Sequence, residues 1–461
     1  MEQKMAHSKW RIPLFIFGAA VLGVSYVVSL FKTETITVAG AVVGAASLAL
    51  FALAAWRLLP SWLNCFGNNK ELTAPLDLTV TREQRKQGMK LILGSLFIHL
   101  LVSMIIRMFA DGDPNPIHAL RIYADIDSIH YTEIAQYGYS NENLGYNVLS
   151  RGERALDLVF FPAYPTLISL LMCLIPDVMI CAYLAAWIPW VGAGFAVYRL
   201  FRMDMPHERA LYVLLIFCLF PAAIFYSVPM SESLFLLVTA SSLYFARKRR
   251  WFLAGLFGMI ASATRSAGVL TLAPLAVELA MQFDWTGFKP FRDPETRKRL
   301  IRSAAWLFLV PVGILYYLSL NRMTTGSMFT FMEYQHYYWG QGMTWFFSGM
   351  ADQMDRLWRD PESVWVLQGW NLVVGFCSLG LMAFKSKNLR PSYTVWFMVY
   401  FAFSYGAARL LSGPRYMAVF FPLAIAIDDL TAKNQKETVF AVLLFGALVF
   451  TGCFVVRSGI W

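Results

Sequence analysis

Four short polar segments of this sequence contain the residues that could carry out acid–base and phosphate chemistry. They are Ala124-Asp-Ile-Asp-Ser-Ile-His-Tyr131, Ser227-Val-Pro-Met-Ser-Glu-Ser233, Thr264-Arg-Ser-Ala-Gly268 and Ser412-Gly-Pro-Arg-Tyr416. A carboxylate can take the proton from an attacking hydroxyl group. Arginine guanidinium groups bind phosphate oxygens through a fixed fork of donors and stabilise the charge on a departing phosphate. Gathered at one membrane face, these segments would suit transfer from a lipid phosphate.

Each of these residues also has a purely structural interpretation. An aspartate such as Asp127 in an external loop is usually a solvated charge, and Glu232 would sit favourably in the first turn of a helix. Arg409 and Arg415, near a helix end, can extend to lipid headgroups. His130 can be a hydrogen-bonded packing residue, and we expect no metal ligands. The other histidines have no metal-ligand spacing: His7, His99, His118, His207 and His336.

The elements that position these segments must be built in a bilayer. Of 461 residues, 58% are hydrophobic and 15% charged, and the mean hydropathy is +0.52. A soluble domain of this length cannot hide so much apolar surface. A span needs about 20 predominantly apolar residues, and such stretches recur along the whole chain. We therefore expect an all-α, polytopic, integral membrane protein.

The net charge of +10 does not indicate nucleic-acid binding. The basic residues form short clusters between apolar segments, which is the pattern that sets membrane orientation. The cysteines have no paired spacing, so neither a disulfide framework nor a zinc site is expected. They are Cys65, Cys173, Cys181, Cys218, Cys377 and Cys453.

Apolar stretches of spanning length recur from the first residues to the last. They lie near 12–31, 36–56, 89–109, 178–200, 207–227, 303–320, 363–383, 393–409 and 437–456. Shorter or interrupted candidates lie at 158–175, 231–246, 251–282 and 414–430.

The distribution of charge predicts the orientation of the spans. The amino terminus and the loop 57–90 are basic, so both are expected on the cytoplasmic side. The span 89–109 then runs outward and delivers an acidic segment, which begins at Ala110, to the external side. The first span has no convincing small-residue cleavage site after it, so we expect it to be retained.

Two stretches need special treatment for this orientation to hold. The stretch 158–175 contains two prolines, which remove backbone donors, and we expect it to lie in the outer interface as a short helix. The stretch 251–282 is too long for one span and carries Arg265 near its middle. Two half-spans that meet at the external face would take Arg265 out of the hydrocarbon. The alternative, one long tilted helix with a buried arginine, is energetically expensive.

This topology has about thirteen crossings, some half-length, with an external carboxyl terminus. It divides the chain into three spans with a basic loop (1–109), a large external loop (110–177), a central bundle (178–320), an external loop (321–362) and the C-terminal spans (363–461). The loop 321–362 is rich in aromatic residues, which also suit an anchoring belt at the interface.

The polar segments resemble the signature of a known family. Asp127-Ser-Ile-His-Tyr-Thr-Glu-Ile-Ala-Gln-Tyr-Gly-Tyr139, followed by Phe160-Phe-Pro-Ala-Tyr-Pro165, resembles the first motif of the PIG-V-like mannosyltransferases, GT-C glycosyltransferases related to GPI mannosyltransferase II. Three later segments of this chain resemble the second, third and fourth motifs of the family. They are, in order, Pro221-Ala-Ala-Ile-Phe-Tyr-Ser227 with Ser231-Glu-Ser-Leu-Phe235, Thr264-Arg-Ser-Ala-Gly268, and Pro414-Arg-Tyr416 with Phe421-Pro422. Gln335 and Trp339 resemble a Q-x-x-x-W element of its late external loop.

The resemblance implies a GT-C helical bundle whose large first external loop carries the catalytic aspartate. Such enzymes move a sugar, here mannose or another hexose, from a polyprenyl or dolichyl phosphate to an acceptor hydroxyl, typically with inversion. Asp127 would be the general base or a carboxylate that orients the acceptor. Ile126 stands where the family usually has tryptophan, so Asp125 is a second candidate for the catalytic acid. Glu232 would support the site, and Arg265 and Arg415 would hold the donor phosphate. Further binding candidates are Arg409, His130, Tyr131, Gln335 and Trp339.

The implied partners are a polyprenyl-phosphate-linked sugar, an acceptor of unknown class and membrane lipids. No cofactor is expected, and the sequence has no nucleotide-binding loop. Ser458-Gly-Ile-Trp461 is no retrieval signal, which favours a prokaryotic plasma membrane, with the active site on its non-cytoplasmic face.

Two other functions compete with this one. A lipid or solute transporter would also contain broken helices and intramembrane charges, but we find no inverted halves, and the polar residues gather at one face. A catalytically silent scaffold would not depend on Asp127.

Overall fold

The computed structural model describes residues 2–32, 36–67, 80–121, 127–139, 156–359, 361–386 and 388–456. Within these residues the regular structure is helical, with one isolated antiparallel bridge between Met343 and Ala407. Seven of the described helices are long and apolar enough to cross a membrane, or eight if the bent pair Ser266–Met281 and Thr286–Arg292 counts as one span. The predicted all-α polytopic architecture is confirmed. The number of crossings stays a prediction, because several shorter helices would have to take part.

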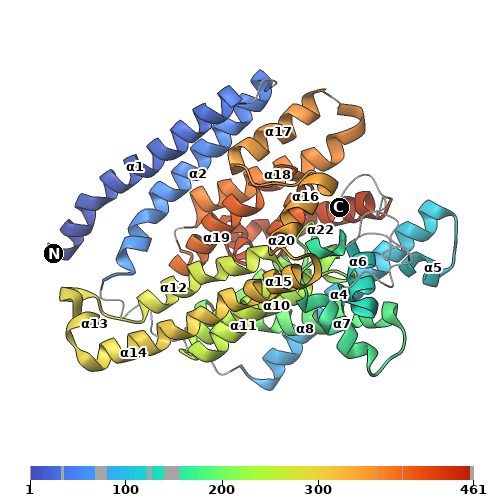
Figure 1. Ribbon diagram of the computed structural model, residues 1–461, viewed down its shortest axis with the longest axis horizontal. Helices are drawn as coiled ribbons and strands as arrows, with labels where there is room; N and C mark the ends of the chain where they lie inside the picture. The colour runs from blue at the N-terminus through green and yellow to red at the C-terminus, as the bar shows by residue number, and fades with distance from the viewer. Residues whose placement is uncertain are drawn as a thin grey trace.

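An N-terminal hairpin lies along one edge of the molecule. Its helices α1 (Glu2–Lys32) and α2 (Val38–Asn64) run side by side, next to α17 (Phe346–Arg359) and α18 (Pro361–Lys385) (Figure 1). The Thr37 hydroxyl caps α2 by accepting from the Gly40 amide, and the Thr37 amide donates to Asp355 of α17 at 3.0 Å. These hydrogen bonds attach the hairpin to α17, within the predicted external loop 321–362.

The helix α4 (Arg82–Asp111) delivers the chain to the acidic segment. A capping box between Thr81 and Gln84 starts it, and Gly112 ends it with a φ of 65°. The short helices α5 (Pro116–Arg121) and α6 (Asp127–Tyr137) follow, and Gly138 ends α6 in the left-handed region.

The stretch predicted to lie in the interface forms two short helices, η3 (Leu156–Val159) and α7 (Ala163–Met172). The 10 residues of α7 reach about 15 Å, half of a hydrocarbon core. This length fits the predicted interfacial helix.

The central bundle begins with α8 (Val178–Asp204), α9 (His207–Cys218), η4 (Ala223–Tyr226) and α10 (Glu232–Arg247). The structure shortens the predicted apolar helix over 207–227, because α9 ends at Cys218. Pro221 lacks the N–H that an α-helix would need there, and the chain continues as a buried 3₁₀ turn.

The stretch 251–282 folds as a helical hairpin, which confirms the predicted break at Arg265. It consists of α11 (Trp251–Thr264), η5 (Ser266–Thr271) and α12 (Leu272–Met281). Arg265 has an extended backbone, with φ −153° and ψ 152°. Directly after α12, Gln282 donates to the carbonyl of Ala246 at the end of α10 at 2.8 Å. The chain has therefore returned to the end of the bundle where α11 begins.

A basic segment and a long bent span follow the hairpin. They comprise η6 (Thr286–Phe288), α13 (Lys289–Arg292), α14 (Pro294–Ala305), η7 (Trp306–Leu309), α15 (Val310–Thr325) and α16 (Thr330–Trp339). Glycines allow α11 and this span to approach closely: a Cβ on Gly255 would lie 2.1 Å from the carbonyl oxygen of Trp306, and one on Gly313 2.0 Å from that of Met259.

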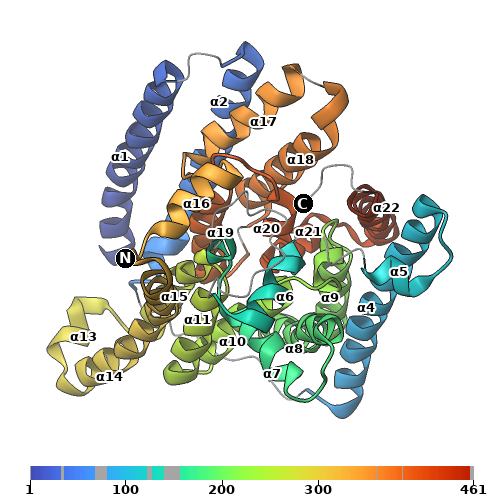
Figure 2. The same ribbon diagram turned by 45° about the vertical axis from the view of Figure 1, so that its right-hand side comes forward.

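The C-terminal helices close the bundle. They are α19 (Pro391–Ser404), α20 (Gly413–Ala418), α21 (Pro422–Leu430), η8 (Lys433–Gln435) and α22 (Lys436–Val455). The predicted stretch 414–430 is broken into α20 and α21 at Pro422, for the same reason as at Pro221. Figures 1 and 2 place α20 in the middle of the molecule, close to α6.

A network of partly buried ion pairs joins the helices at the end of the bundle where α11 begins. Arg390 Nη2 donates to Glu278 Oε2 at 2.8 Å, and Arg247 makes two hydrogen bonds to Asp204, at 2.8 and 2.6 Å. These residues connect α8, α10, α12 and the start of α19. Because each buried charge has a partner of opposite sign, the network holds the bundle together without an uncompensated charge.

Candidate active site

Arg415 joins two acidic residues that lie far apart in the sequence. Its Nη1 donates to Asp127 Oδ2 at 2.6 Å, and its Nε donates to Glu232 Oε1. Arg265 Nη1 donates to the same oxygen of Glu232. The structure therefore gathers one residue from each of the four polar segments into one cluster of two carboxylates and two guanidinium groups.

Local helix geometry places each member of this cluster. Asp127 and Glu232 lie in the first turns of α6 and α10, where the helix dipole favours a negative charge. Arg415 lies in the last turn of α20, where it favours a positive one. The extended backbone at Arg265 directs its side chain away from the axes of α11 and η5.

The cluster is closed on one side and open on the other. Glu232 is fully buried, and the side chain of Arg415 is 6% exposed, whereas the side chains of Arg265 and Asp127 are 20% and 31% exposed. Among the described residues, Glu232 Oε2 has no hydrogen-bond partner. The open side lets a phosphate or a hydroxyl group approach Arg265 and Asp127.

The electrostatics keep Asp127 ionised. Burial raises its pKa, but the charge of Arg415 and the hydrogen bond from it lower the pKa by more, with smaller contributions from the charges of His130 and Arg265. The net pKa of Asp127 therefore lies below the ordinary value for an aspartate.

A glycine in the third motif allows the approach that sets Arg265. A Cβ on Gly268 would lie 2.0 Å from the carbonyl oxygen of Ala261, so η5 can fold back on α11 only without a side chain there. The close approach of two backbone segments thus explains why this motif has a glycine at position 268, which the sequence alone does not reveal.

Sequence reasoning missed Asn371, which holds the start of α20. The fully buried Asn371 accepts from the Gly413 amide at 2.9 Å and donates to the Leu410 carbonyl and to Gln353, each at 2.9 Å. These bonds satisfy a backbone donor at the helix start two residues before Arg415. The residue lies inside a mainly apolar helix, α18, where an amide side chain in the middle of a predicted span was the available signal.

Several aromatic side chains lie near the cluster. Tyr131 lies 3.0 Å (hydroxyl oxygen to hydroxyl oxygen) from Ser231, the residue before Glu232. His130 stacks on Phe160 at 4.4 Å between ring centroids, and Trp339 packs edge-on against His130 at 6.0 Å. His130, Tyr131 and Trp339 therefore lie beside the cluster, and their contact with a substrate stays a prediction.

Comparison with known proteins finds one matching family. Residues 118–338 match the family model described as Mannosyltransferase (PIG-V). The predicted family resemblance is confirmed. The matched segment includes Asp127, Glu232 and Arg265. Arg415 lies beyond its end, and the tertiary structure brings it into contact with Asp127 and Glu232. A comparison with curated proteins finds no match.

The PIG-V family match supports a glycosyltransferase and does not favour the transporter alternative. Its mannosyltransferase description also implies a lipid-linked sugar donor and an acceptor. A cluster that contains both guanidinium groups and carboxylates is consistent with these two substrates.

Two predicted residues, Arg409 and Gln335, have contacts away from the cluster. Arg409 is exposed, and its Nη1 donates to the carbonyl of Trp339 at 3.5 Å. The carbonyl of Gln335 accepts from the Gln341 amide at 2.8 Å, so its backbone shapes the turn after α16. Asp125 lies outside the described residues, and the choice between it and Asp127 as the acid stays open.

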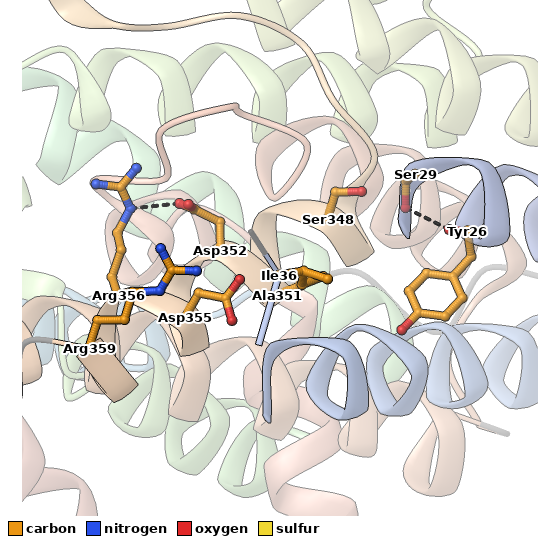
Figure 3. Close-up of a pocket in the computed structure, with 9 residues that line it drawn as sticks. All are labelled: Tyr26, Ser29, Ile36, Ser348, Ala351, Asp352, Asp355, Arg356 and Arg359. Atoms are coloured by element: carbon orange, nitrogen blue, oxygen red, sulfur yellow. Dashed lines mark hydrogen bonds and ion pairs between the residues drawn. The ribbon is translucent and has the colours of Figure 1, made fainter. Parts of the chain in front are cut away.

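A cavity elsewhere in the molecule contains none of the predicted site residues. It has a volume of about 330 Å³ and lies between the α1–α2 hairpin and α17 (Figure 3). Arg356 Nε donates to Asp352 at 2.8 Å, and Asp355 binds the Thr37 amide. Asp355 therefore joins α17 to the α1–α2 hairpin, whereas Asp352 pairs within α17. The charge cluster at Asp127 remains the candidate for chemistry.

Proposed function

We propose that this protein transfers a hexose, with mannose as the first candidate, from a polyprenyl-phosphate donor to an acceptor hydroxyl at the non-cytoplasmic membrane face. The observation that carries the proposal is the sharing of Arg415 between Asp127 and Glu232. It puts a candidate base beside a candidate phosphate-binding group, at a site with an open side.

The arginines would bind the donor phosphate. Arg265 and Arg415 present guanidinium donors whose positive charge offsets the charge that grows on the phosphate as the sugar departs. Glu232 is buried between them and holds both side chains in place. Because the site lies at the ends of spanning helices, the lipid tail of the donor would remain in the bilayer while its phosphate reaches the arginines. This position supports a lipid-linked donor.

Asp127 would act on the acceptor. The acceptor oxygen forms a bond to the anomeric carbon while the bond from that carbon to the phosphate oxygen breaks, and the hydroxyl proton passes to Asp127. The bonding electrons leave with the lipid phosphate. One displacement of this kind inverts the anomeric centre.

Donor binding would also activate this base. A phosphate that draws Arg415 toward itself weakens the hydrogen bond and charge interaction that lower the pKa of Asp127. The pKa of Asp127 then rises, and the carboxylate becomes a better proton acceptor once a donor is in place.

The arrangement of charge supports an external site. In Figures 1 and 2 the basic helices α13 and α14 lie at the opposite side of the molecule from α5 and α6. Basic segments stay in the cytoplasm, so α6 would face the other side of a multi-pass membrane protein, in agreement with a catalytic loop over 110–177.

The test is glycosyl transfer by the variant Asp127→Asn, measured with a panel of polyprenyl-phosphate sugars and native lipid extract as acceptor source. Removal of a general base lowers the rate by about 10²- to 10⁴-fold, while abundance and membrane insertion stay normal. Asp113→Asn is the matched control, because Asp113 lies in the same predicted external loop and pairs with His118 instead of Arg415. Near wild-type turnover of Asp127→Asn would remove Asp127 from the mechanism.

A further inference from the structure

Three potential metal ligands converge beside the charge cluster. His130 and Glu133 are three residues apart on α6 and so lie on one face of the helix. Asp157 reaches them from η3, and its Oδ1 lies 2.6 Å from His130 Nδ1. One ligand atom from each of the three residues lies within 4.8 Å of the other two.

Hydrogen bonds among the described residues do not account for this group. Asp157 is 2% exposed, and its second carboxylate oxygen is buried without a hydrogen-bond partner among the described residues. In the same described part of the chain, neither Asp157 nor Glu133 forms an ion pair with a lysine or arginine. A His130–Asp157 hydrogen bond explains one oxygen, but it leaves two carboxylates close together and facing a single imidazole. The buried carboxylate of Asp157, with the half-buried carboxylate of Glu133 beside it, favours a bound cation.

We propose that His130, Glu133 and Asp157 bind one divalent transition-metal ion. One imidazole nitrogen and two carboxylate oxygens form a mixed donor set that suits Mn²⁺ or Zn²⁺ better than Ca²⁺ or Mg²⁺, which prefer oxygen ligands alone. The ion supplies a positive charge that no lysine or arginine of the described residues provides to the two carboxylates, and it engages the buried oxygen of Asp157.

The position of the proposed ion would affect the orientation of Asp127. His130 lies about one helical turn after Asp127 on α6, and its ring stacks on Phe160, which directly follows η3. An ion held by α6 and η3 together fastens the helix that carries Asp127 to the following segment of the external loop. The metal site is thus distinct from the residues proposed to bind phosphate, and it fixes the orientation of the acid.

The experiment is a Mn²⁺ titration of the purified full-length protein in nanodiscs after removal of metal with EDTA. Electron paramagnetic resonance of free Mn²⁺ reports binding without substrate, so the result is independent of the proposed glycosyl transfer. We expect one saturable site per chain, and at least tenfold weaker binding for Glu133→Gln and for Asp157→Asn. Glu133 is only half-buried, so its isosteric variant keeps the fold even if Asp157→Asn does not.

A second His–Asp pair provides the matched control. His118 Nδ1 lies 2.7 Å from Asp113 Oδ2 on an exposed surface, and no third ligand joins them among the described residues. Asp113→Asn should leave Mn²⁺ binding unchanged. Absence of saturable binding to the wild type, wild-type affinity of Glu133→Gln, or equal loss in Asp113→Asn would overturn the proposal.

Discussion

Arg415 and Asp127 form an ion pair across 288 positions of sequence, with 2.6 Å between Nη1 and Oδ2. The same guanidinium group holds Glu232 through its Nε. A bound phosphate would have to compete with a carboxylate for Arg415, which links donor binding to the state of the acid. The following predictions test this link and the elements that position it.

The fork of Arg415 should matter more for donor use than for folding. Arg415→Ala leaves Glu232 buried without one of its partners, which costs about 3–5 kcal/mol, so Arg415→Lys is the more informative variant. Lysine keeps the charge but loses the fixed fork of donors. We expect the KM for the lipid-phosphate donor to rise at least about tenfold, with little change in the unfolding temperature. Unchanged donor dependence in a turnover assay would count against the phosphate role.

The pH profiles of wild-type transfer should differ between kcat/KM and kcat. Arg415, Arg265 and His130 lower the pKa of Asp127 in the free protein, so the acidic limb of kcat/KM, which reports the free enzyme, lies at low pH. A bound phosphate draws Arg415 away and raises that pKa, so the acidic limb of kcat lies at higher pH. Acidic limbs that coincide, or that fall in the reverse order, would contradict donor-dependent activation of Asp127.

Asn371 should act through α20. Asn371→Ala removes an acceptor from the Gly413 amide and two donated hydrogen bonds, at a cost of about 1–3 kcal/mol for each buried group left unpaired. We expect lower thermal stability and a larger loss of transfer than stability alone explains, because the start of α20 positions Arg415. Gln353→Ala removes one partner of Asn371 and leaves the Gly413 bond, so it should preserve more activity. If both variants lose transfer equally, Asn371 has no special positioning role.

Gly268 should tolerate no side chain. Its Cβ would overlap the Ala261 carbonyl, so Gly268→Ala must displace η5 and with it Arg265, and overpacking of this kind costs about 1–3 kcal/mol. We expect reduced abundance, together with reduced transfer in the protein that does fold. Gly380→Ala is the control, since no atom lies within 4 Å of its Cβ position. Thermal unfolding and turnover of the two variants should separate clearly.

Local signals in the sequence were enough to predict most helices and several breaks between them. The charge of Arg265 within an apolar stretch predicted the hairpin of α11 and α12, and the prolines near 162 and 165 predicted the short helix α7. The same reasoning overran the end of α9 and did not divide 414–430, because hydropathy continues across Pro221 and Pro422 while helical hydrogen bonding does not.

The sequence by itself determined the membrane class, the chemical types of the site residues and their positions at helix ends, since these depend on composition and on neighbours along the chain. Only the tertiary structure decided which of them meet. Arg409 and Arg415 are six positions apart and look alike in sequence, yet one is exposed and the other is buried between Asp127 and Glu232. Likewise, Asn371 and Asp157 acquired their roles from packing. The physical reason is that helix faces are set by local spacing, whereas the contacts between faces are set by how distant helices pack.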